Sequence, residues 1–306
     1  MTTGTTVAAP AAPPAPPPPP DRLRRVRRWA WASIAVNAGI VVTGGAVRLT
    51  NSGLGCPTWP RCTDASYVTT PEMGIHGAIE FGNRTLTFVV GLVALGGLIA
   101  AWRLRPRPRG LLGLALAVLV GIGVQGVVGG ITVHLELHPL VVGGHFLLSM
   151  GLLALTYAFW WRSRPPGAAP AGVGTGARRL GGALAAATLL ALAVGTLVTG
   201  SGPHSGDADA ARNGLDPELI SKVHAASVYL LVALTVALLA LLRRRGAPAG
   251  AVRAAWALLA VELAQGVLGF VQYYTGLPEL LVGAHLLGAC LVWLAALHAR
   301  AHTRTA

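Results

Sequence analysis

The chain has 306 residues, of which 53% are hydrophobic and only 11% are charged, and its formal net charge is +13. With so few charges and a mean hydropathy of +0.60, it cannot cover itself with a water-soluble surface, which excludes an ordinary soluble enzyme or binding domain. The excess of basic residues does not indicate nucleic-acid binding, because the arginines alternate with long apolar segments. This composition is typical of a polytopic membrane protein.

Residues 1–28 begin with a proline-rich stretch and end in an arginine cluster. The segment has no apolar core, and its basic residues follow the uncharged part instead of preceding it, so it lacks the order of a signal peptide. We expect residues 1–28 to be a disordered tail in the cytoplasm.

Eight apolar segments follow this tail, each about twenty residues long, which is the length needed to cross about 30 Å of hydrocarbon. We therefore predict an all-α integral membrane protein with eight transmembrane helices. The predicted segments are residues 29–47, 78–102, 110–133, 140–161, 180–200, 219–242, 254–274 and 280–297.

Charges between the segments predict the orientation. Arginines cluster at alternate ends of the helices, and eight of the eleven acidic residues lie in the opposite loops. By the positive-inside rule, the arginine clusters and both termini face the cytoplasm. A single lysine among so many arginines and alanines is typical of a GC-rich bacterial genome. We therefore expect a multi-pass protein of the bacterial plasma membrane, with the first loop and its two cysteines on the extracytoplasmic side. The clusters are residues 22–28, 103–109, 162–179, 242–253 and 300–304.

Two stretches of the chain resemble one another. QGVVGGITVHLELHPLVVGGHF spans residues 125–146 and QGVLGFVQYYTGLPELLVGAHL spans residues 265–286, and in both a histidine follows the glutamine by twenty residues, at His145 and His285. Such a duplication predicts two pseudo-symmetric four-helix bundles. The predicted parts are an N-terminal bundle at 29–162, a cytoplasmic linker at 163–179, a C-terminal bundle at 180–298 and a cytoplasmic tail at 299–306.

The matched histidines predict a bound metallocofactor, most naturally haem, because imidazole is its usual axial ligand and four-helix bundles commonly hold it. Aligning the halves also places His224 at the position of Asn83. The second half therefore offers His224 and His285 from facing helices, which suits electron transfer. The first half offers His145 opposite an asparagine, which leaves room for exchange or chemistry. The alternative for each histidine is a hydrogen-bonded packing residue.

A polar face near the start of the second segment carries His76, Glu80 and Asn83, which are four and three residues apart. A carboxylate in the first turn of a membrane helix is costly unless it is paired, hydrated or used, so Glu80 is a candidate functional residue. The alternative is a residue at the water boundary that the helix N-terminus stabilises. His76 could replace the histidine absent at Asn83 as a ligand.

Cys56 and Cys62 enclose five residues, two of them prolines, in the first outer loop. An oxidising compartment is where thiols pair, so we expect a disulfide there. Because a short closed loop constrains little of the unfolded chain, a redox or loop-shaping role and a purely structural role both stay open. Two cysteines alone do not make a zinc site. Cys290, in the middle of a helix, is interpreted as a buried apolar residue.

At these residues the sequence resembles the haem A synthase family. The similarity covers essentially the whole chain after about residue 29, and it is carried by VRLTNSGLGCPTWPRC (47–62), IEFGNR (79–84), GPHSGD (202–207) and the two QGVxG repeats. The resemblance implies eight helices in two halves and the oxidation of a methyl substituent of haem O to a formyl group, by successive hydroxylation and loss of water from the diol. The product, haem A, serves terminal oxidases.

The resemblance also implies haem O in the N-terminal half and a low-spin haem b in the C-terminal half. Carried over residue by residue, the resemblance implies that His224 and His285 are the haem b ligands and that His145 is a ligand of the substrate haem. It also implies that Glu80 is a catalytic carboxylate and that Cys56 and Cys62 are the cysteine pair of the first outer loop. Two features depart from the family pattern. Many members have a histidine where this chain has Asn83, and some have a second cysteine pair in the third outer loop, which this sequence lacks.

A mechanism follows from this resemblance. A haem O synthase is expected to deliver the substrate within the lipid bilayer, where His145 fixes it. Glu80 would act as a base or as an electrostatic partner of the carbon being oxidised. Arg48 and Arg84 are candidates to pair with haem propionates, although interfacial arginines also reach toward lipid headgroups. Electrons would leave through haem b to a membrane acceptor, and terminal oxidase assembly would use the product. A homo-oligomer is left open.

Two other classes of function are weighed against this one. A dihaem cytochrome would pass electrons to quinone without altering its haem. A transporter with duplicated bundles would use its histidines for proton coupling. Against the transporter, the helices are nearly free of polar groups at mid-membrane, with Glu262 as the exception.

Overall fold

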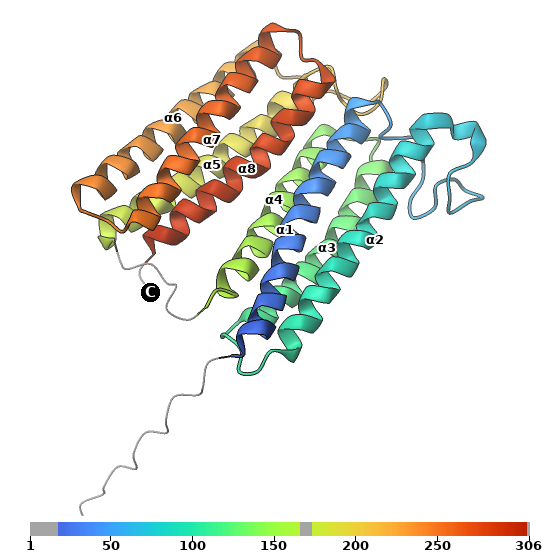
Figure 1. Ribbon diagram of the computed structural model, residues 1–306. Coiled ribbons are helices and arrows are strands. Elements are labelled where there is room, and N and C mark those ends of the chain that lie inside the picture. The colour runs from blue at the N-terminus through green and yellow to red at the C-terminus, as the bar shows by residue number, and fades with distance from the viewer. Residues whose placement is uncertain (1–17, 166–172, 305–306) are drawn as a thin grey trace, which may run out of the picture.

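The computed structural model describes residues 18–165 and 173–304. Within these ranges the chain forms eight long helices and one short 3-10 helix, with no strand (Figure 1). All eight long helices have the length and apolar composition to cross a membrane, so the predicted all-α membrane class is confirmed. The elements are α1 Pro20–Leu49, η1 Pro71–Met73, α2 Gly74–Arg103, α3 Leu111–His134, α4 Pro139–Arg162, α5 Gly174–Ser201, α6 Pro217–Arg244, α7 Ala249–Tyr274 and α8 Glu279–Thr303.

Several helices are longer than the apolar segments that predict them. α1 begins at Pro20, so residues 20–28, which we expected to be part of a disordered tail, are helical. Hydropathy marks only the part of a helix inside hydrocarbon, whereas arginine is a good helix former and proline suits the first turn. For the same reason, residues 174–179 and 299–303 are helical instead of linker and tail. The predicted disorder of residues 1–17 falls outside the described residues.

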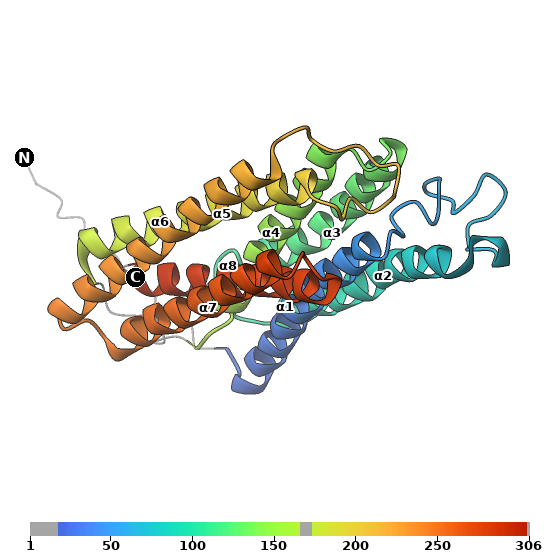
Figure 2. The same ribbon diagram turned by 90° about the horizontal axis from the view of Figure 1, so that it is seen from above.

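The helices pack in two closed groups of four. α1 contacts α2 and α4, and α3 contacts α2 and α4; α5, α6, α7 and α8 repeat this pattern. The groups meet where α1 contacts α8, α4 contacts α5, and α4 contacts α8. Seen from above, the helices therefore lie in two rows, α6–α5–α4–α3 and α7–α8–α1–α2 (Figure 2).

The molecule has two distinct ends. We call the end with the loops at 50–70 and 202–216 the cysteine-loop end, and the opposite end, where α1 begins and α8 finishes, the arginine end (Figure 1). Every odd-numbered helix finishes at the cysteine-loop end and every even-numbered helix begins there. The helices alternate in this way because each runs antiparallel to the one before it, and because their number is even, α1 begins and α8 finishes at the same end.

The sequence repeat has the same backbone in both copies at the turns that join α3 to α4 and α7 to α8. Leu137 N–H donates to the Thr132 carbonyl at 2.8 Å, and Leu277 N–H donates to the Gln272 carbonyl at 2.8 Å. Positive φ angles occur at Glu136 (49°) and Leu137 (59°), and again at Gly276 (79°) and Leu277 (61°). These are helix C-caps in which a left-handed residue lets the chain reverse within a few residues.

The apolar core lies toward the arginine end and the middle of the membrane. Three of its clusters fill the two groups of helices, and a fourth joins them, with Trp293 Nε1 donating to the Met150 carbonyl at 2.8 Å. Cys290 is fully buried in this fourth cluster, as the sequence predicts. No buried member of a cluster lies within the last two turns at the cysteine-loop end of its helix. The interior at that end is therefore built from other residues.

Candidate functional site

Three histidines occupy equivalent depths at the cysteine-loop end. His145 and His285 are six residues, and His224 seven residues, from the first residue of α4, α8 and α6. At 1.5 Å per residue each lies about 9 to 11 Å from the start of its helix. The part of the molecule between the apolar core and the cysteine-loop end thus receives one imidazole from α4, one from α6 and one from α8.

The rings of these three histidines lack the hydrogen bonds that buried imidazoles normally make. Nδ1 of His145, His224 and His285 is buried without a partner among the described residues. His302, in an aromatic cluster at the arginine end, is the other imidazole of this kind. A ring nitrogen lies within 3.0 Å of an oxygen atom, by contrast, in His76, His134, His204 and His298. An unsatisfied buried polar group costs about 1 to 3 kcal/mol, so a packing role does not account for the three.

Each of the three imidazoles lies against a glycine of the preceding helix. A Cβ atom built on Gly129 would be 3.5 Å from Cε1 of His145. The corresponding distances are 3.3 Å from Gly195 to Cε1 of His224 and 3.2 Å from Gly269 to Cε1 of His285. A larger residue would press on the ring, so glycine lets each imidazole rest directly on the neighbouring backbone.

The second half carries two of these imidazoles, on α6 and α8. α6 and α8 are diagonal in their group, since each contacts α5 and α7 but they do not contact each other in the described chain. In the first half α2 and α4 are the diagonal pair, and they carry Asn83 and His145.

This donor set fits haem iron better than a bare metal ion. Within residues 18–165 and 173–304 there is no group of three or more His, Cys, Asp or Glu side chains that could hold a metal. A porphyrin supplies four nitrogen ligands itself, so one or two imidazoles are enough to complete the iron's coordination. The unpartnered imidazoles and their glycine contacts are consistent with that use.

The glutamine that opens each repeat fixes the helix that carries the histidine. Gln125 Nε2 donates to the His145 carbonyl at 3.2 Å, and Gln265 Nε2 donates to the His285 carbonyl at 2.8 Å. Gln125 Nε2 also donates to Oγ of Ser149. The spacing of twenty residues is therefore the distance along the chain from a donor on one helix, through the turn, to its acceptor on the next.

We predict that Gln265→Leu destabilises the protein and loosens the register of α7 against α8. Loss of one interhelical hydrogen bond in a membrane protein costs about 0.6 to 1.7 kcal/mol, which thermal unfolding in detergent would measure. Gln272→Leu on the same helix is the control, because Oε1 of Gln272 is buried without a partner and its removal should be neutral or stabilising. Equal losses in both variants would contradict the anchoring role of Gln265.

Glu80 on α2 is buried, with 5% of its surface exposed, and both of its oxygens accept hydrogen bonds. Oε2 accepts the Cys56 N–H at 2.7 Å. Oε1 accepts from Nε of Arg84 at 3.1 Å and from the Nη2 atom of the same guanidinium. The carboxylate thus joins α2 to the cysteine loop.

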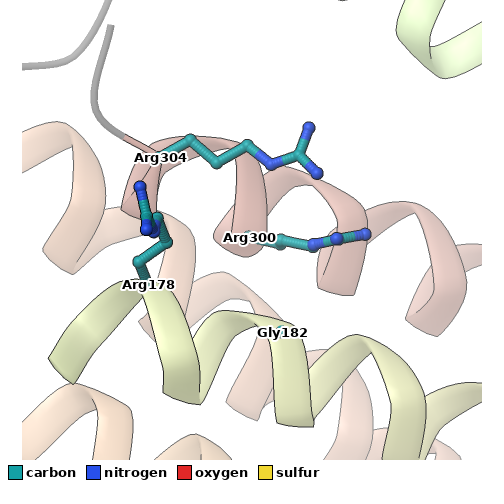
Figure 3. Close-up of a pocket in the computed structure, with 4 residues that line it drawn as sticks. All are labelled: Arg178, Gly182, Arg300 and Arg304. Atoms are coloured by element: carbon teal, nitrogen blue, oxygen red, sulfur yellow. The ribbon is translucent and has the colours of Figure 1, made fainter. Parts of the chain in front are cut away.

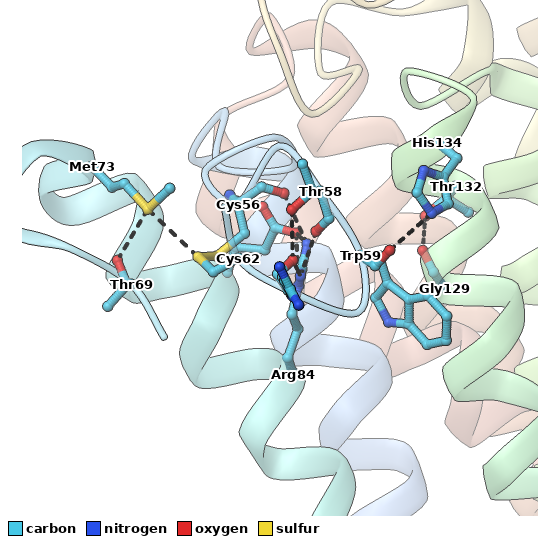
Figure 4. Close-up of polar contacts among 12 residues, drawn as sticks. Cys56, Thr58, Trp59, Cys62, Thr69, Met73, Arg84, Gly129, Thr132 and His134 are labelled. Atoms are coloured by element: carbon cyan, nitrogen blue, oxygen red, sulfur yellow. Dashed lines mark hydrogen bonds and ion pairs between the residues drawn. A yellow bond between two sulfur atoms is a disulfide. The ribbon is translucent and has the colours of Figure 1, made fainter. Parts of the chain in front are cut away.

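Arg84 is fully engaged in this connection (Figure 4). Besides Glu80, its Nη atoms donate to the carbonyl oxygens of Cys56, Thr58 and Arg61 at 2.9, 2.8 and 3.1 Å. A guanidinium has five N–H groups, and all five are used here. Arg84 therefore has no free donor for a haem propionate, the contact for which the sequence made it a candidate, and its geometry is that of a loop anchor.

The cysteine loop contains the predicted disulfide and reaches across the first group of helices. Cys56 and Cys62 are bonded and both are fully buried. From the same loop, the ring of Trp59 packs against Gly130 of α3, and the Trp59 carbonyl lies 3.0 Å from Nε2 of His134 (Figure 4). The loop is thus held by α2 on one side and by α3 on the other.

We predict that Cys56→Ser/Cys62→Ser loosens this loop. The chain-entropy relation gives roughly 2 kcal/mol for a loop of this size, and the partners of Glu80 and Arg84 would lose their fixed positions. Thermal unfolding with and without reductant would show the effect in the native protein and not in the double variant. Cys290→Ala controls for the loss of a thiol alone. Unchanged stability and full activity would leave the disulfide without a role.

The other residues named by the sequence lie around this region. Asn83 Oδ1 accepts from Oγ1 of Thr43 at 2.7 Å, and Gly44 faces Asn83 as the other glycines face histidines. His76 is exposed, and its Nδ1 lies 3.0 Å from Oγ of Ser52 in the loop.

Arg48 connects the two groups of helices at the cysteine-loop end. Its Nε and Nη2 donate to the carbonyls of His204 at 2.5 Å and Thr199 at 2.8 Å. Glu262, the polar exception inside the second half, accepts from Oγ1 of Thr235 at 2.8 Å and is 2% exposed.

Two kinds of contact at this site have a signal in the sequence that the sequence analysis does not interpret, and a third has none. The glutamines mark the repeat, yet their bond to the histidine carbonyl requires knowing that the turn brings the two helices side by side. Arg84 follows Glu80 by four residues, the spacing of a helical ion pair. Trp59 gives no such signal, because its partner Gly130 is distant in the chain.

This chain is similar to known proteins over nearly its whole length. The profile of the COX15-CtaA family, described as cytochrome oxidase assembly protein, matches residues 27–204. A protein named Heme A synthase from Methylobacterium sp. (strain 4-46) is 32% identical over 342 aligned residues, which cover 91% of this chain and 92% of the relative. The Heme A synthase of Azorhizobium caulinodans is 30% identical and covers 90% of this chain and 93% of its own length. The chain therefore belongs to the COX15-CtaA family of cytochrome oxidase assembly proteins.

Proposed function

We propose that this protein is a haem A synthase, an oxidoreductase that converts the methyl group of haem O to the formyl group of haem A. One observation carries the proposal: three buried imidazoles whose Nδ1 has no partner among the described residues lie at one depth near the cysteine-loop end, two in the second half and one in the first. The single one shares its half with the buried Glu80. The relatives named Heme A synthase support the same activity.

His224 and His285 are proposed to hold a resident haem b in the second half. Their Nδ1 atoms lack partners among the described residues, and a glycine of the preceding helix lies against each ring. Haem b, when bound, supplies reversible one-electron transfer. The protein's contribution is to fix two imidazoles, with Gln265 anchoring α8 at the His285 carbonyl.

His145 is proposed to hold the substrate haem O in the first half, from the side opposite Asn83. The side chain at that position already accepts a hydrogen bond from Thr43, so it is proposed to line the site rather than to bind iron. His76 is bonded to the loop and is given the same peripheral role. The substrate iron would then keep one protein ligand, which suits a molecule that must enter and leave.

Glu80 is proposed to stabilise positive charge that develops on the methyl carbon. A carboxylate in a low-dielectric environment acts far more strongly than in water, provided that it is held in place in advance. The N–H groups of Cys56 and Arg84 hold it in that way. Because both oxygens are already hydrogen bonded, an electrostatic role fits this geometry better than that of a base.

The cysteine loop is proposed to cover the substrate half. It is tied to α2 through Arg84 and to α3 through Trp59, two helices of that half that contact each other. Burial of both sulfur atoms supports a loop-shaping role for the disulfide rather than a redox role. Arg48, with two of its five N–H groups used, remains the candidate for a propionate contact.

The arginine end is proposed to face the cytoplasm of a bacterial cell, with the cysteine loop outside. The matched turns and matched glutamine bonds support a pseudo-symmetric relation of the two halves. In this setting a haem O synthase would supply the substrate through the bilayer, a membrane carrier would take the electrons, and an oxidase under assembly would receive the product.

Identification of the extracted haems tests the proposal. The chain is expressed in a host that makes haem O and has no haem A synthase of its own, and the haems of the purified protein and the membranes are separated by chromatography. Haem A that depends on the chain is the expected result. Haem b as the only pigment, with no haem A formed, would favour a dihaem cytochrome instead. A colourless protein from a haem-replete host would contradict both.

A further inference from the structure

The arginine end carries an unusual excess of positive charge. The segments 1–28, 103–110, 162–179, 243–253 and 299–306 together contain 19 arginines and a single acidic side chain, Asp21. Asp21 already forms an ion pair with Arg24. The remaining arginines have no carboxylate side chain at this end of the molecule to pair with.

Three of these arginines line a pocket between α1 and α2. Arg22 and Arg25 lie in the first two turns of α1, and Arg103 is the last residue of α2. The pocket has a volume of about 470 Å³. None of the three guanidinium groups has an ion pair or hydrogen bond within the described part of the chain. The rim of the pocket is therefore a set of unpaired planar donors, the chemistry that recognises phosphate.

The wall of the same pocket is apolar. It is formed by Trp29, Gly96, Ile99 and Ala100, and Ile99 is 40% exposed on the outer face of α2. Gly96 lies two helical turns, about 10 Å, from Arg103 along α2. A Cβ at Gly96 would meet the Trp29 ring at 2.7 Å, so glycine allows the indole to form this wall. The pocket thus runs from the charged end of the helices into the part that crosses the membrane.

We propose that the pocket between α1 and α2 binds one anionic phospholipid. Its phosphate would lie among Arg22, Arg25 and Arg103, and the upper part of an acyl chain would lie along Gly96 and Ile99. Basic pockets between membrane helices commonly bind anionic lipid headgroups. An inorganic phosphate ion would use the arginines but not the apolar wall.

A second pocket is also lined by arginines but lacks the apolar wall of the first. Arg178 of α5 and Arg300 and Arg304 at the end of α8 surround a pocket of about 370 Å³ whose remaining lining residue is Gly182 (Figure 3). It has the cations without an apolar wall. For this reason the lipid site is assigned to the pocket between α1 and α2.

Native mass spectrometry of the full chain in mild detergent tests the assignment. Phosphatidylglycerol and phosphatidylcholine with identical acyl chains are titrated separately, with and without inorganic phosphate. The native protein is expected to bind one phosphatidylglycerol at least about tenfold more tightly than phosphatidylcholine. Arg22→Gln/Arg25→Gln/Arg103→Gln should lose this preference. Arg243→Gln/Arg244→Gln/Arg245→Gln, which removes three charges from the end of α6, should keep it.

Ile99→Asn separates a lipid from a phosphate ion, because it makes the apolar wall polar at a part-exposed position and leaves all three arginines in place. A lipid site loses affinity in this variant, whereas a phosphate site does not. Equal phosphatidylglycerol binding by the native protein and the triple variant of Arg22, Arg25 and Arg103 would overturn the proposal. So would displacement of the lipid by inorganic phosphate with no effect of Ile99→Asn. Monodisperse elution and an unchanged unfolding temperature check that each variant is folded.

Discussion

Glu80→Gln is expected to lower the rate of haem A formation by a factor on the order of 10² to 10³, while the protein still binds haem. Losses of that size are typical when one preorganised electrostatic group is removed from an active site. Glutamine has nearly the same shape as glutamate, so the change removes the charge without leaving a cavity. Haem A formed per unit of protein measures the effect, and the haem extracted from the same sample shows that binding is retained.

The hydrogen bonds of Glu80 mean that glutamine changes more than the charge. Cys56 and Arg84 both donate to this carboxylate, from two sides. An amide offers one oxygen and one NH₂ group, so in either orientation an N–H would face another N–H. The variant therefore loses one anchor of the loop as well as the charge. Glu80→Asp keeps the charge, and activity above that of Glu80→Gln is expected from it.

Glu72→Gln is the matched control. Glu72 is also near the start of the second transmembrane segment, but it is exposed and lies in η1 before the helix. Its substitution should leave haem A formation unchanged. If Glu80→Gln had no effect on the rate, Glu80 would not take part in the reaction. If the Glu80→Gln variant lost haem together with activity, the role of Glu80 would be to hold the site together.

The parts of the fold that sequence predicts are those with a strong local signal. Eight apolar segments gave eight helices, because each crossing must satisfy its own backbone hydrogen bonds. The sequence did not predict that α1 begins at Pro20 and α5 at Gly174, because hydropathy detects only the part of a helix that lies in hydrocarbon. Arginine-rich stretches read as tail or linker are, in this protein, the first turns of α1 and α5.

Sequence predicts those residues of the candidate site that are polar or ionisable and lie in an apolar helix, where burial costs free energy. Glu80 and the three histidines stand out because polar groups in apolar helices require a reason. What they touch could not be predicted. Arg84 was interpreted as a propionate ligand, and its bonds to the carbonyls of Thr58 and Arg61 depend on how an irregular loop folds back. Such contacts have no periodicity in sequence.

His224→Ala and His285→Ala are each expected to remove nearly all bound haem b. A haem held by two axial imidazoles gives a low-spin spectrum, and loss of either ligand removes that signature. The pyridine haemochrome content and the low-spin absorption bands of the purified variants measure the result. Both variants should give the same loss, because the two rings act as one pair and each rests on its own glycine, Gly195 or Gly269.

Exogenous imidazole distinguishes loss of a ligand from loss of the fold. Alanine at either position leaves a space of about the size of the missing ring, so imidazole added with haem should restore the low-spin spectrum of a folded variant. His298→Ala is the control on α8, because His298 is bonded to the Tyr157 hydroxyl at 3.0 Å near the arginine end and should not affect haem b. Haem b retained with a normal low-spin spectrum in His224→Ala or His285→Ala would rule out the proposed ligand pair, whereas rescue by imidazole in both would place the iron between α6 and α8.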